Sequence, residues 1–231
     1  MNIDTKKSVY LQASKVYKSY KTGENIVSVL RGIDFSAFTG EWVAILGASG
    51  SGKTTLLNIL GALEMPDSGE ITLGGTPYSG MSNNEAAEFR RQKVGFIFQS
   101  YHMLPEFTLI ENVMLPGMLG RTNWVGVKKR AEKLIDQVKL SHRIEHKPTE
   151  LSGGEQQRVA IARSLINEPS IVLADEPTGN LDSETGKEIL EIFKGLHDFN
   201  KTIIMVTHDL EVAKFADRIV RVRDGITEGE I

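Results

Sequence analysis

The sequence predicts an α/β fold in which a mostly parallel sheet is covered by helices. A glycine-rich stretch at 47–54 lies between an apolar run typical of a buried strand and a run typical of a helix. From residue 170 onward, strand-like and helix-like segments alternate, as they do in parallel sheets. Residues 100–150 contain helix-like segments and no convincing strand, which indicates a helical lobe inserted into the α/β core.

The composition is that of an ordinary globular protein. Hydrophobic residues make up 40% and charged residues 25% of the 231 residues, a length that suits one large domain or one domain with an inserted lobe. The formal net charge of −3 argues against a nucleic-acid-binding protein, which usually carries a basic excess. The sequence has no cysteine, which excludes disulfides and cysteine metal sites and suits a reducing compartment.

Neither a membrane span nor a secretion signal is recognisable in the sequence. No apolar run approaches the ~20 residues that cross a bilayer. Residues 1–10 are polar and lack the apolar segment of a secretion signal. We therefore expect a cytoplasmic protein whose association with a membrane would come through a partner.

The first third of the chain predicts an antiparallel layer beside the strand that precedes the glycine-rich stretch. Its predicted elements, in chain order, are a strand at 8–13, a loop over Tyr17–Gly23, a strand at 26–37, a buried strand at 42–46, a helix from residue 54 and a strand at 70–73. Gly74 and Gly75 follow the last of these strands as a turn.

The rest of the chain predicts the helical lobe and the alternating part of the core. The elements are a helix at 83–92, a strand at 94–98, the lobe at 100–150, a helix at 155–167, strands at 170–175, 202–207 and 218–223, and helices at 183–199 and 209–216. Residues 1–99 and 151–231 would then form the core, and 100–150 the helical subdomain, of a single domain. Phosphate sites are expected at the carboxyl ends of the parallel strands.

The glycine-rich stretch predicts a nucleoside triphosphate site. Its glycines let the backbone turn its N–H groups toward phosphate oxygens, and the helix that follows adds positive potential. Lys53 would reach the β- and γ-phosphates, and the hydroxyl of Thr54 would bind Mg²⁺. The alternative is a Gly/Ser-rich turn that matches the pattern by chance. The predicted binding residues are Gly47, Ala48, Ser49, Gly50, Ser51, Gly52, Lys53, Thr54 and Thr55.

Two adjacent carboxylates, Asp175 and Glu176, end the apolar strand Ile171–Ala174. A buried parallel strand has no structural use for two acids at its end, because unpaired buried charge is costly. A magnesium nucleotide gives both a role: Asp175 would hold Mg²⁺, and Glu176 would orient and polarise the attacking water. The structural alternative is that Asp175 caps the next segment.

His208 and Gln99 each follow a predicted strand at its carboxyl end. Taken alone, a histidine in such a place is more often a structural hydrogen-bonding group than a catalytic one. Their position beside the expected phosphate site makes both candidates for catalysis.

A second helix start with anion-binding character lies at Ser152–Gly154. Ser152 can cap the helix, and the two glycines let backbone N–H groups face outward. The alternative is an ordinary capped helix after a glycine turn. The sequence thus contains two phosphate-binding helix starts but one P-loop lysine, and physical reasoning from the residues does not explain why.

The ordered set G-A-S-G-S-G-K-T, Gln99, L-S-G-G-E, I-V-L-A-D-E and His208 resembles the ATP-binding subunit of ABC transporters over nearly the whole chain. The resemblance implies a RecA-like P-loop NTPase core with an inserted helical lobe. It also implies ATP hydrolysis, with Lys53 and His208 stabilising the charge that develops on the phosphoryl group.

The resemblance further implies a homodimer stacked head to tail, in which each nucleotide lies between the P-loop of one chain and the signature of the other. In that arrangement Ser152, Gly153 and Gly154 contact the γ-phosphate bound by the partner chain. Asp182, in the segment that resembles the D-loop, would lie across the dimer interface.

The remaining site residues follow from the same resemblance. Tyr20 matches the aromatic residue that stacks on adenine, with Tyr17 as the rival. Gln99 would sense the γ-phosphate, contribute to the Mg²⁺ site with Thr54 and Asp175, and link the site to the helical lobe.

Within the family, three segments resemble the lipoprotein-releasing ATPases: Phe98–Thr108, Ala174–Asp182 and, near the end of the sequence, Arg223–Gly225. Their relatives, the MacB-type efflux ATPases and the FtsE-type regulatory ATPases, share most of these motifs and remain alternatives. The resemblance implies a peripheral protein on the cytoplasmic face of the inner membrane. Integral membrane subunits would contact it through residues at about 100–118.

Overall fold

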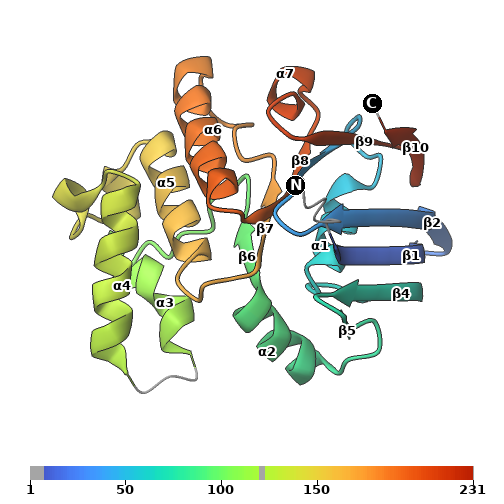
Figure 1. Cartoon of the computed structure of the whole chain (residues 1–231), viewed down its shortest axis with the longest axis horizontal. Coiled ribbons are helices and arrows are strands. Elements are labelled where there is room, and N and C mark those ends of the chain that lie inside the picture. Colours follow the sequence, from blue (N-terminus) through green and yellow to red (C-terminus); the bar gives the residue numbers. More distant parts are fainter. Residues whose placement is uncertain (1–7, 120–122, 231) are drawn as a thin grey trace, which may run out of the picture.

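Residues 8–119 and 123–230, which the computed structural model describes, form a six-stranded sheet, a four-stranded sheet and the helices that pack on them (Figure 1). The strands are β1 (Val9–Thr22), β2 (Asn25–Phe38), β3 (Trp42–Leu46), β4 (Ser68–Leu73), β5 (Thr76–Pro77), β6 (Val94–Ile97), β7 (Ile171–Asp175), β8 (Thr202–Thr207), β9 (Arg218–Arg223) and β10 (Ile226–Glu230). The α-helices are α1 (Lys53–Leu60), α2 (Asn83–Lys93), α3 (Leu109–Met118), α4 (Trp124–Gln137), α5 (Gly153–Ser164), α6 (Ser183–Asp198) and α7 (Leu210–Ala213).

The large sheet has the strand order β10-β9-β3-β8-β7-β6. Neighbouring strands from β9 to β6 are parallel, and β10 pairs with β9 in the antiparallel sense. Leu46 lies opposite Thr207, and Asp175 lies opposite Val206, so β3, β8 and β7 end at the same level. The loops that follow these strands and β6 therefore meet at one edge of the sheet. This arrangement confirms the predicted α/β fold with a mostly parallel sheet.

The predicted antiparallel layer is present as a sheet of order β2-β1-β4-β5. The loop predicted over Tyr17–Gly23 is wrong: β1 continues through this segment and pairs with β2 as far as Thr22, opposite Asn25. Several shifts in register interrupt the alternation of apolar residues along β1. The alternating pattern that predicts a strand is therefore missing from this segment. The turn is confined to Gly23 and Glu24, and Gly23 has a left-handed φ of 61°.

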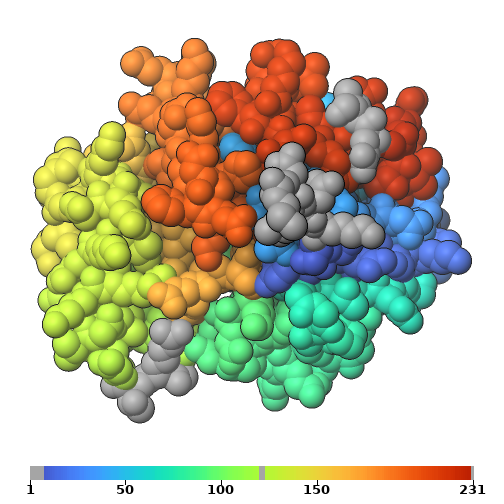
Figure 2. Space-filling model, in the orientation of Figure 1, coloured from blue at the N-terminus to red at the C-terminus, as the bar shows by residue number. Residues whose placement is uncertain are grey.

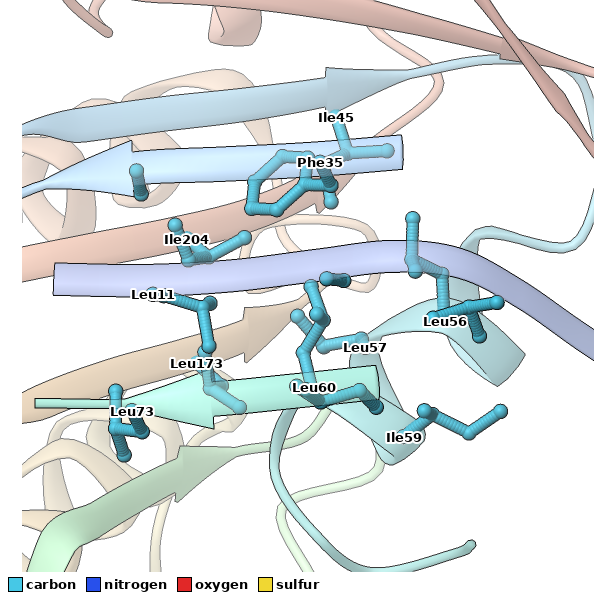
Figure 3. Packing of buried hydrophobic residues seen from close by; sticks show 14 of the residues in the cluster. Leu11, Phe35, Ile45, Leu56, Leu57, Ile59, Leu60, Leu73, Leu173 and Ile204 are labelled. Carbon is cyan, nitrogen blue, oxygen red and sulfur yellow. The ribbon is translucent and has the colours of Figure 1, made fainter. Parts of the chain in front are cut away.

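Alternating side chains of the central strands fill two apolar layers, one on each face of the large sheet. Ile45 and Ile204 point toward α1 and the small sheet, where they pack with Leu57 and Phe35 (Figure 3). Their neighbours along the strands point the other way, and Ile203 packs in the layer that α3 to α6 complete. Both faces of these strands are buried, which explains their continuous apolar sequences.

The helical lobe comprises α3, α4 and two short 3-10 turns, Ser141–Arg143 and Pro148–Glu150. It forms the left side of the molecule in Figure 1, where α5 and α6 lie between it and the sheets, and the yellow-green surface at the left of Figure 2 belongs to it. Thr108 begins α3 with a capping box that includes Glu111. The inserted helical lobe is therefore confirmed.

Two elements near the end of the chain differ from the prediction. The helix expected at 209–216 is the single turn α7, because the chain enters a turn at Lys214 and Phe215 and then leads into β9. β10 was not predicted; it follows a tight turn in which Asp224 and Gly225 both have positive φ. No helix in residues 8–119 or 123–230 is long and apolar enough to span a membrane.

The packing of α1 on the sheet yields a stability prediction. Gly61→Ala should lower the free energy of unfolding by about 1–3 kcal/mol. A Cβ at this position would lie 1.9 Å from Cζ of Phe96 and 2.8 Å from Cδ1 of Leu173, inside a close-packed core. Urea denaturation monitored by circular dichroism measures the change.

Gly195→Ala is the matched control, because this glycine lies inside α6 and an added Cβ would meet no atom within 4 Å. Because alanine has a higher helix propensity than glycine, this variant should raise the free energy of unfolding by up to about 1 kcal/mol. Equal stability of the two variants would show that Phe96 can move aside and that the close approach of α1 to the sheet is dispensable.

Candidate nucleotide-binding and hydrolysis site

The glycine-rich stretch forms a curled loop between β3 and α1. Gly50 and Gly52 have left-handed φ values of 78° and 99°, and Gly52 is the N-cap residue of α1. A Cβ at Gly47 would lie 2.3 Å from the carbonyl oxygen of Val222, so only glycine fits this close approach. A curled loop that leads into a helix start suits an anion, because the first N–H groups of a helix have no partner within the helix.

Lys53 and Ser51 bring buried polar groups to the same loop. Lys53 is 7% exposed, and its ammonium group donates a hydrogen bond to the carbonyl oxygen of Ala48 at 2.9 Å. The Ser51 hydroxyl is buried and has no hydrogen-bond partner within the described part of the chain. A buried cation and a buried hydroxyl beside free N–H groups suit an anionic ligand such as a phosphate group.

Asp175, at the carboxyl end of β7, faces the start of α1. Its Oδ1 atom lies 3.3 Å from the Thr54 hydroxyl, which donates to it. Burial raises the pKa of Asp175, and the charge of Glu176 adds to the increase, whereas the Thr54 hydrogen bond and the charge of Lys53 oppose it. The alternative of a capping role is wrong, since Asp182 is the residue that caps α6.

These oxygen atoms fit a magnesium ion. Mg²⁺ prefers carboxylate and hydroxyl oxygens, and a cation here would favour the ionised form of a carboxylate that burial penalises. Thr54 and Asp175 are the residues that would hold the ion together with phosphate oxygens of the substrate.

Glu176 and His208 meet at the ends of β7 and β8. Nδ1 of His208 lies 2.9 Å from both carboxylate oxygens of Glu176. Glu176 has a left-handed φ of 45°, and its N–H donates to the carbonyl oxygen of Val206. A non-glycine residue in this conformation is strained, and such strain is concentrated at functional sites. The backbone of β8 therefore holds the Glu176 carboxylate at the edge of the site.

Gln99 follows β6, and its side chain and backbone both bond to Asn180. Its amide nitrogen donates to Oδ1 of Asn180 at 3.2 Å, and the Asn180 amide donates to the carbonyl oxygen of Gln99 at 3.0 Å. Asn180 was not among the predicted site residues; its only signal in the sequence is its place beside Asp182 in the segment after Glu176. The predicted contact of Gln99 with Mg²⁺ stays a prediction.

The second helix start has the predicted cap. Ser152 forms a capping box with Glu155 at the beginning of α5. An added Cβ at Gly154 would lie 2.3 Å from the Thr185 side chain, so this glycine lets α5 approach α6. In Figure 1 the start of α5 and the start of α1 lie on opposite sides of β6 and β7. One chain therefore does not bring its two anion-binding helix starts together.

Of the two candidate tyrosines, Tyr20 is the one beside the phosphate-binding helix. Its hydroxyl donates to Glu64 at 2.6 Å and contacts the side chain of Thr55. Burial and the Glu64 hydrogen bond raise the pKa of Tyr20, so the phenol stays neutral. Tyr17 is 45% exposed, and its hydroxyl lies against Gly32 in the hairpin.

Asp182 has a local role in the structure. Its carboxylate accepts hydrogen bonds from the N–H groups of Glu184 and Thr185 and from the Thr185 hydroxyl, and so caps α6. The Thr185 side chain, followed by backbone hydrogen bonds, lowers the pKa of Asp182. A contact across a dimer interface stays a prediction.

The model of the ABC transporter family matches residues 30–179, which carry the phosphate-binding loop, Gln99, the helix start at Ser152 and the carboxylates of β7. The chain belongs to the ABC transporter family. It is an ATP-binding subunit of that family, and its nucleotide site is that of an enzyme that hydrolyses ATP.

Individual relatives cover nearly the whole chain. The lipoprotein-releasing system ATP-binding protein LolD of Saccharophagus degradans is 46% identical over 217 residues, 94% of this chain and 95% of that protein. The macrolide export ATP-binding/permease protein MacB of a Shewanella species is 46% identical over 94% of this chain and 33% of its own length.

Solved structures support the same family fold. A dimeric structure of a post-hydrolysis state of the ATP-binding cassette MJ0796, bound to ADP and Pi, has a TM-score of 0.89 and 42% sequence identity to this chain. The match covers 96% of this chain and 97% of that chain. This likeness confirms the P-loop NTPase fold.

The raised pKa of Asp175 yields a prediction of opposite effects on stability and activity. A carboxyl group whose pKa is raised by folding stabilises the fold below its unfolded-state pKa, and that contribution is lost as the pH rises through the folded-state pKa. At pH 7 the ionised group opposes folding. Asp175→Asn should therefore raise the free energy of unfolding of the nucleotide-free protein by on the order of 1 kcal/mol, while Mg²⁺-dependent ATP hydrolysis is lost.

Thermal unfolding at pH 7 and at pH 4 checks this prediction, since the gain should shrink at the lower pH. Asp182→Asn is the control of opposite sign, because the pKa of Asp182 is lowered by folding and its charge stabilises α6 at pH 7. A loss of stability in Asp175→Asn at pH 7 would mean that Thr54 and Lys53 already compensate the buried carboxylate.

Proposed function

We propose that the chain is the ATP-hydrolysing subunit of a transporter that releases lipoproteins from the inner membrane. The observation that carries the catalytic part is the meeting of the phosphate-binding loop, Asp175, Glu176 and His208 at one edge of the sheet. The LolD relative and the resemblance of residues 98–108 to the lipoprotein-releasing ATPases support the substrate.

In this proposal, two chains close around two ATP molecules. Lys53 and the N–H groups at the start of α1 bind the phosphates, and Tyr20 stacks on adenine. Ser152, Gly153 and Gly154 of the second chain contact the γ-phosphate from the opposite side. The separation of the two helix starts within one chain supports this arrangement, because each site is incomplete without the partner.

Hydrolysis then follows from residues of one site. Glu176 orients the attacking water and accepts its proton, and His208 holds the carboxylate through Nδ1. Lys53 stabilises the charge that develops on the transferred phosphoryl group. When bound, Mg²⁺ adds charge stabilisation to the phosphate oxygens beside Thr54 and Asp175. Cleavage removes the γ-phosphate that joins the two chains, and the dimer opens.

Residues at about 100–118 form the proposed surface for the membrane subunits. Leu104 and Phe107 are 38% and 39% exposed. The buried Asn112 holds the backbone of both: it accepts from the N–H of Leu104 and donates to the carbonyl oxygens of Leu104 and Phe107. A rigid backbone that presents two apolar side chains a few residues after Gln99 suits a partner helix that must respond to the nucleotide.

The proposal also sets where the chain acts and how it is organised. It acts as one ATP-binding domain, with residues 100–150 as the helical subdomain, peripheral on the cytoplasmic face of the inner membrane. Macrolide-type efflux is the second candidate, because the MacB relative matches as much of this chain as LolD does.

Glu176→Gln tests the catalytic role and the dimer together. The variant should bind ATP, lose roughly 10²–10⁴-fold in turnover and accumulate as a closed dimer, because the phosphate that joins the chains is no longer removed. Steady-state phosphate release and size-exclusion chromatography with and without ATP measure these effects. Turnover near that of the unaltered protein would remove Glu176 from its proposed role.

Phe107→Asp tests the membrane surface and the substrate. In proteoliposomes with the membrane subunits that co-purify with the chain, ATP should release a lipidated protein from the bilayer. The variant should abolish release while the ATPase of the isolated chain stays within about twofold of the original, since an exposed side chain that is not among the proposed nucleotide-binding residues is replaced.

Phe199→Asp is the matched control, because Phe199 is 85% exposed and lies at the end of α6. Release by this variant should be unchanged. ATP-driven efflux of a macrolide without release of lipoprotein would favour the second candidate function and refute the first.

A further inference from the structure

Two consecutive residues after Gln99 have left-handed backbones. Tyr101 and His102 have φ values of 56° and 48°. Neither residue is glycine, so this conformation is unfavourable for both and persists only where surrounding groups hold it. The loop that carries Gln99 to the helical lobe is therefore held in its shape by contacts outside itself.

Arg163 supplies these contacts from the last turn of α5. Its guanidinium donates to the carbonyl oxygen of Tyr101 and to that of His102, each at 2.5 Å. The two adjacent carbonyl oxygens match the fork of donors on arginine, which no other side chain offers. Burial lowers the pKa of Arg163, but an arginine keeps its proton in proteins and remains a donor on both arms.

Tyr101 also touches the beginning of the same helix. A Cβ added at Gly153 would lie 2.9 Å from the Tyr101 hydroxyl. Tyr101 thus has its carbonyl oxygen bound to the last turn of α5 and its hydroxyl beside the first residue of α5. A displacement of the loop after Gln99 would act on the whole helix, including the start that follows Ser152.

A second contact joins α5 to the catalytic strand end. The amide of Gln157, a fully buried residue, donates at 2.8 Å to the carbonyl oxygen of Pro177, which follows Glu176. The helix is therefore bonded to two loops that each bear a residue of the nucleotide site, Gln99 and Glu176.

We propose that Arg163 and Tyr101 are positioning residues that couple the two nucleotide sites of the dimer through α5. The state of Gln99 in one site would set the position of Ser152–Gly154, which contacts the γ-phosphate of the other site. This inference rests on the proposed function, because it requires that the start of α5 acts on the partner's nucleotide. The two hydrogen bonds from Arg163 to the carbonyl oxygens of Tyr101 and His102 would thus carry the communication between the sites.

Arg163→Lys tests the coupling, because a lysine keeps the charge but cannot span both carbonyl oxygens in fixed geometry. Cooperativity of ATP hydrolysis should fall to a Hill coefficient of about 1. The value of kcat should drop about tenfold, while ATP affinity of the dilute monomer stays within about twofold, because the phosphate-binding loop is untouched. If Arg163 only stabilised the fold, the variant would have a lower melting temperature but would keep the Hill coefficient and kcat of the unaltered protein.

Arg130→Lys is the matched control. Arg130 on α4 also donates to two adjacent carbonyl oxygens, those of Leu165 and Ile166, and pairs with Glu168, but none of these residues belongs to the loop after Gln99. This variant should lose stability and keep the Hill coefficient. If Arg163→Lys does not fold, Arg163→Gln replaces it. A neutral amide can still donate a hydrogen bond and costs less to bury than an ammonium group.

The outcomes separate this inference from the function on which it rests. If Glu176→Gln forms no ATP-dependent dimer, the proposed function fails. If that dimer forms and the Arg163 variant keeps the cooperativity and kcat of the Arg130 variant, the coupling through Arg163 is refuted. Loss of cooperativity in Arg163→Lys alone supports it.

Discussion

The parallel register of β3, β8, β7 and β6 is the constraint on which the nucleotide site depends. Four neighbouring strands that end at one edge bring together residues far apart in the chain. The phosphate-binding loop, His208, the two carboxylates and Gln99 each lie at the end of one of these strands or within two residues of it. Because the strands are buried on both faces, their hydrogen bonds and apolar side chains hold the edge rigid, and the loops can carry polar and strained residues.

The polar groups at this edge are costly for the isolated chain, and local contacts reduce the cost without removing it. Lys53 rests on the carbonyl oxygen of Ala48, the Thr54 hydroxyl donates to Asp175, and His208 bonds with Glu176. Each contact is one that a phosphate, a cation or a water molecule could replace. In the proposed site, binding of a nucleotide would exchange these internal partners for stronger ones, so the residues that are costly in the free protein would be the ones that give affinity.

Local signals in the sequence predict most of this site, and long-range contacts limit the rest. Apolar runs that end in polar residues locate β3, β7 and β8 and the residues that follow them, since both faces of these strands are buried. β1 was mistaken for a loop where its register shifts. The contacts of Asn180 and Arg163 could not be predicted from neighbouring residues, because each bonds to a carbonyl group more than 60 residues away in the chain.

In the proposed dimer, the geometry of α5 would link ATP hydrolysis to motion between the two chains. Its first turn begins with two glycines after the Ser152 cap, yet it lies across β6 and β7 from the start of α1 in its own chain. Its last turn is bonded to the loop after Gln99. A helix bonded to one nucleotide site at its end and open to another at its beginning cannot satisfy both within one chain. In the proposed dimer the glycine-rich loop at 47–54 is half of a binding site, and Ser152–Gly154 of a second chain would supply the other half.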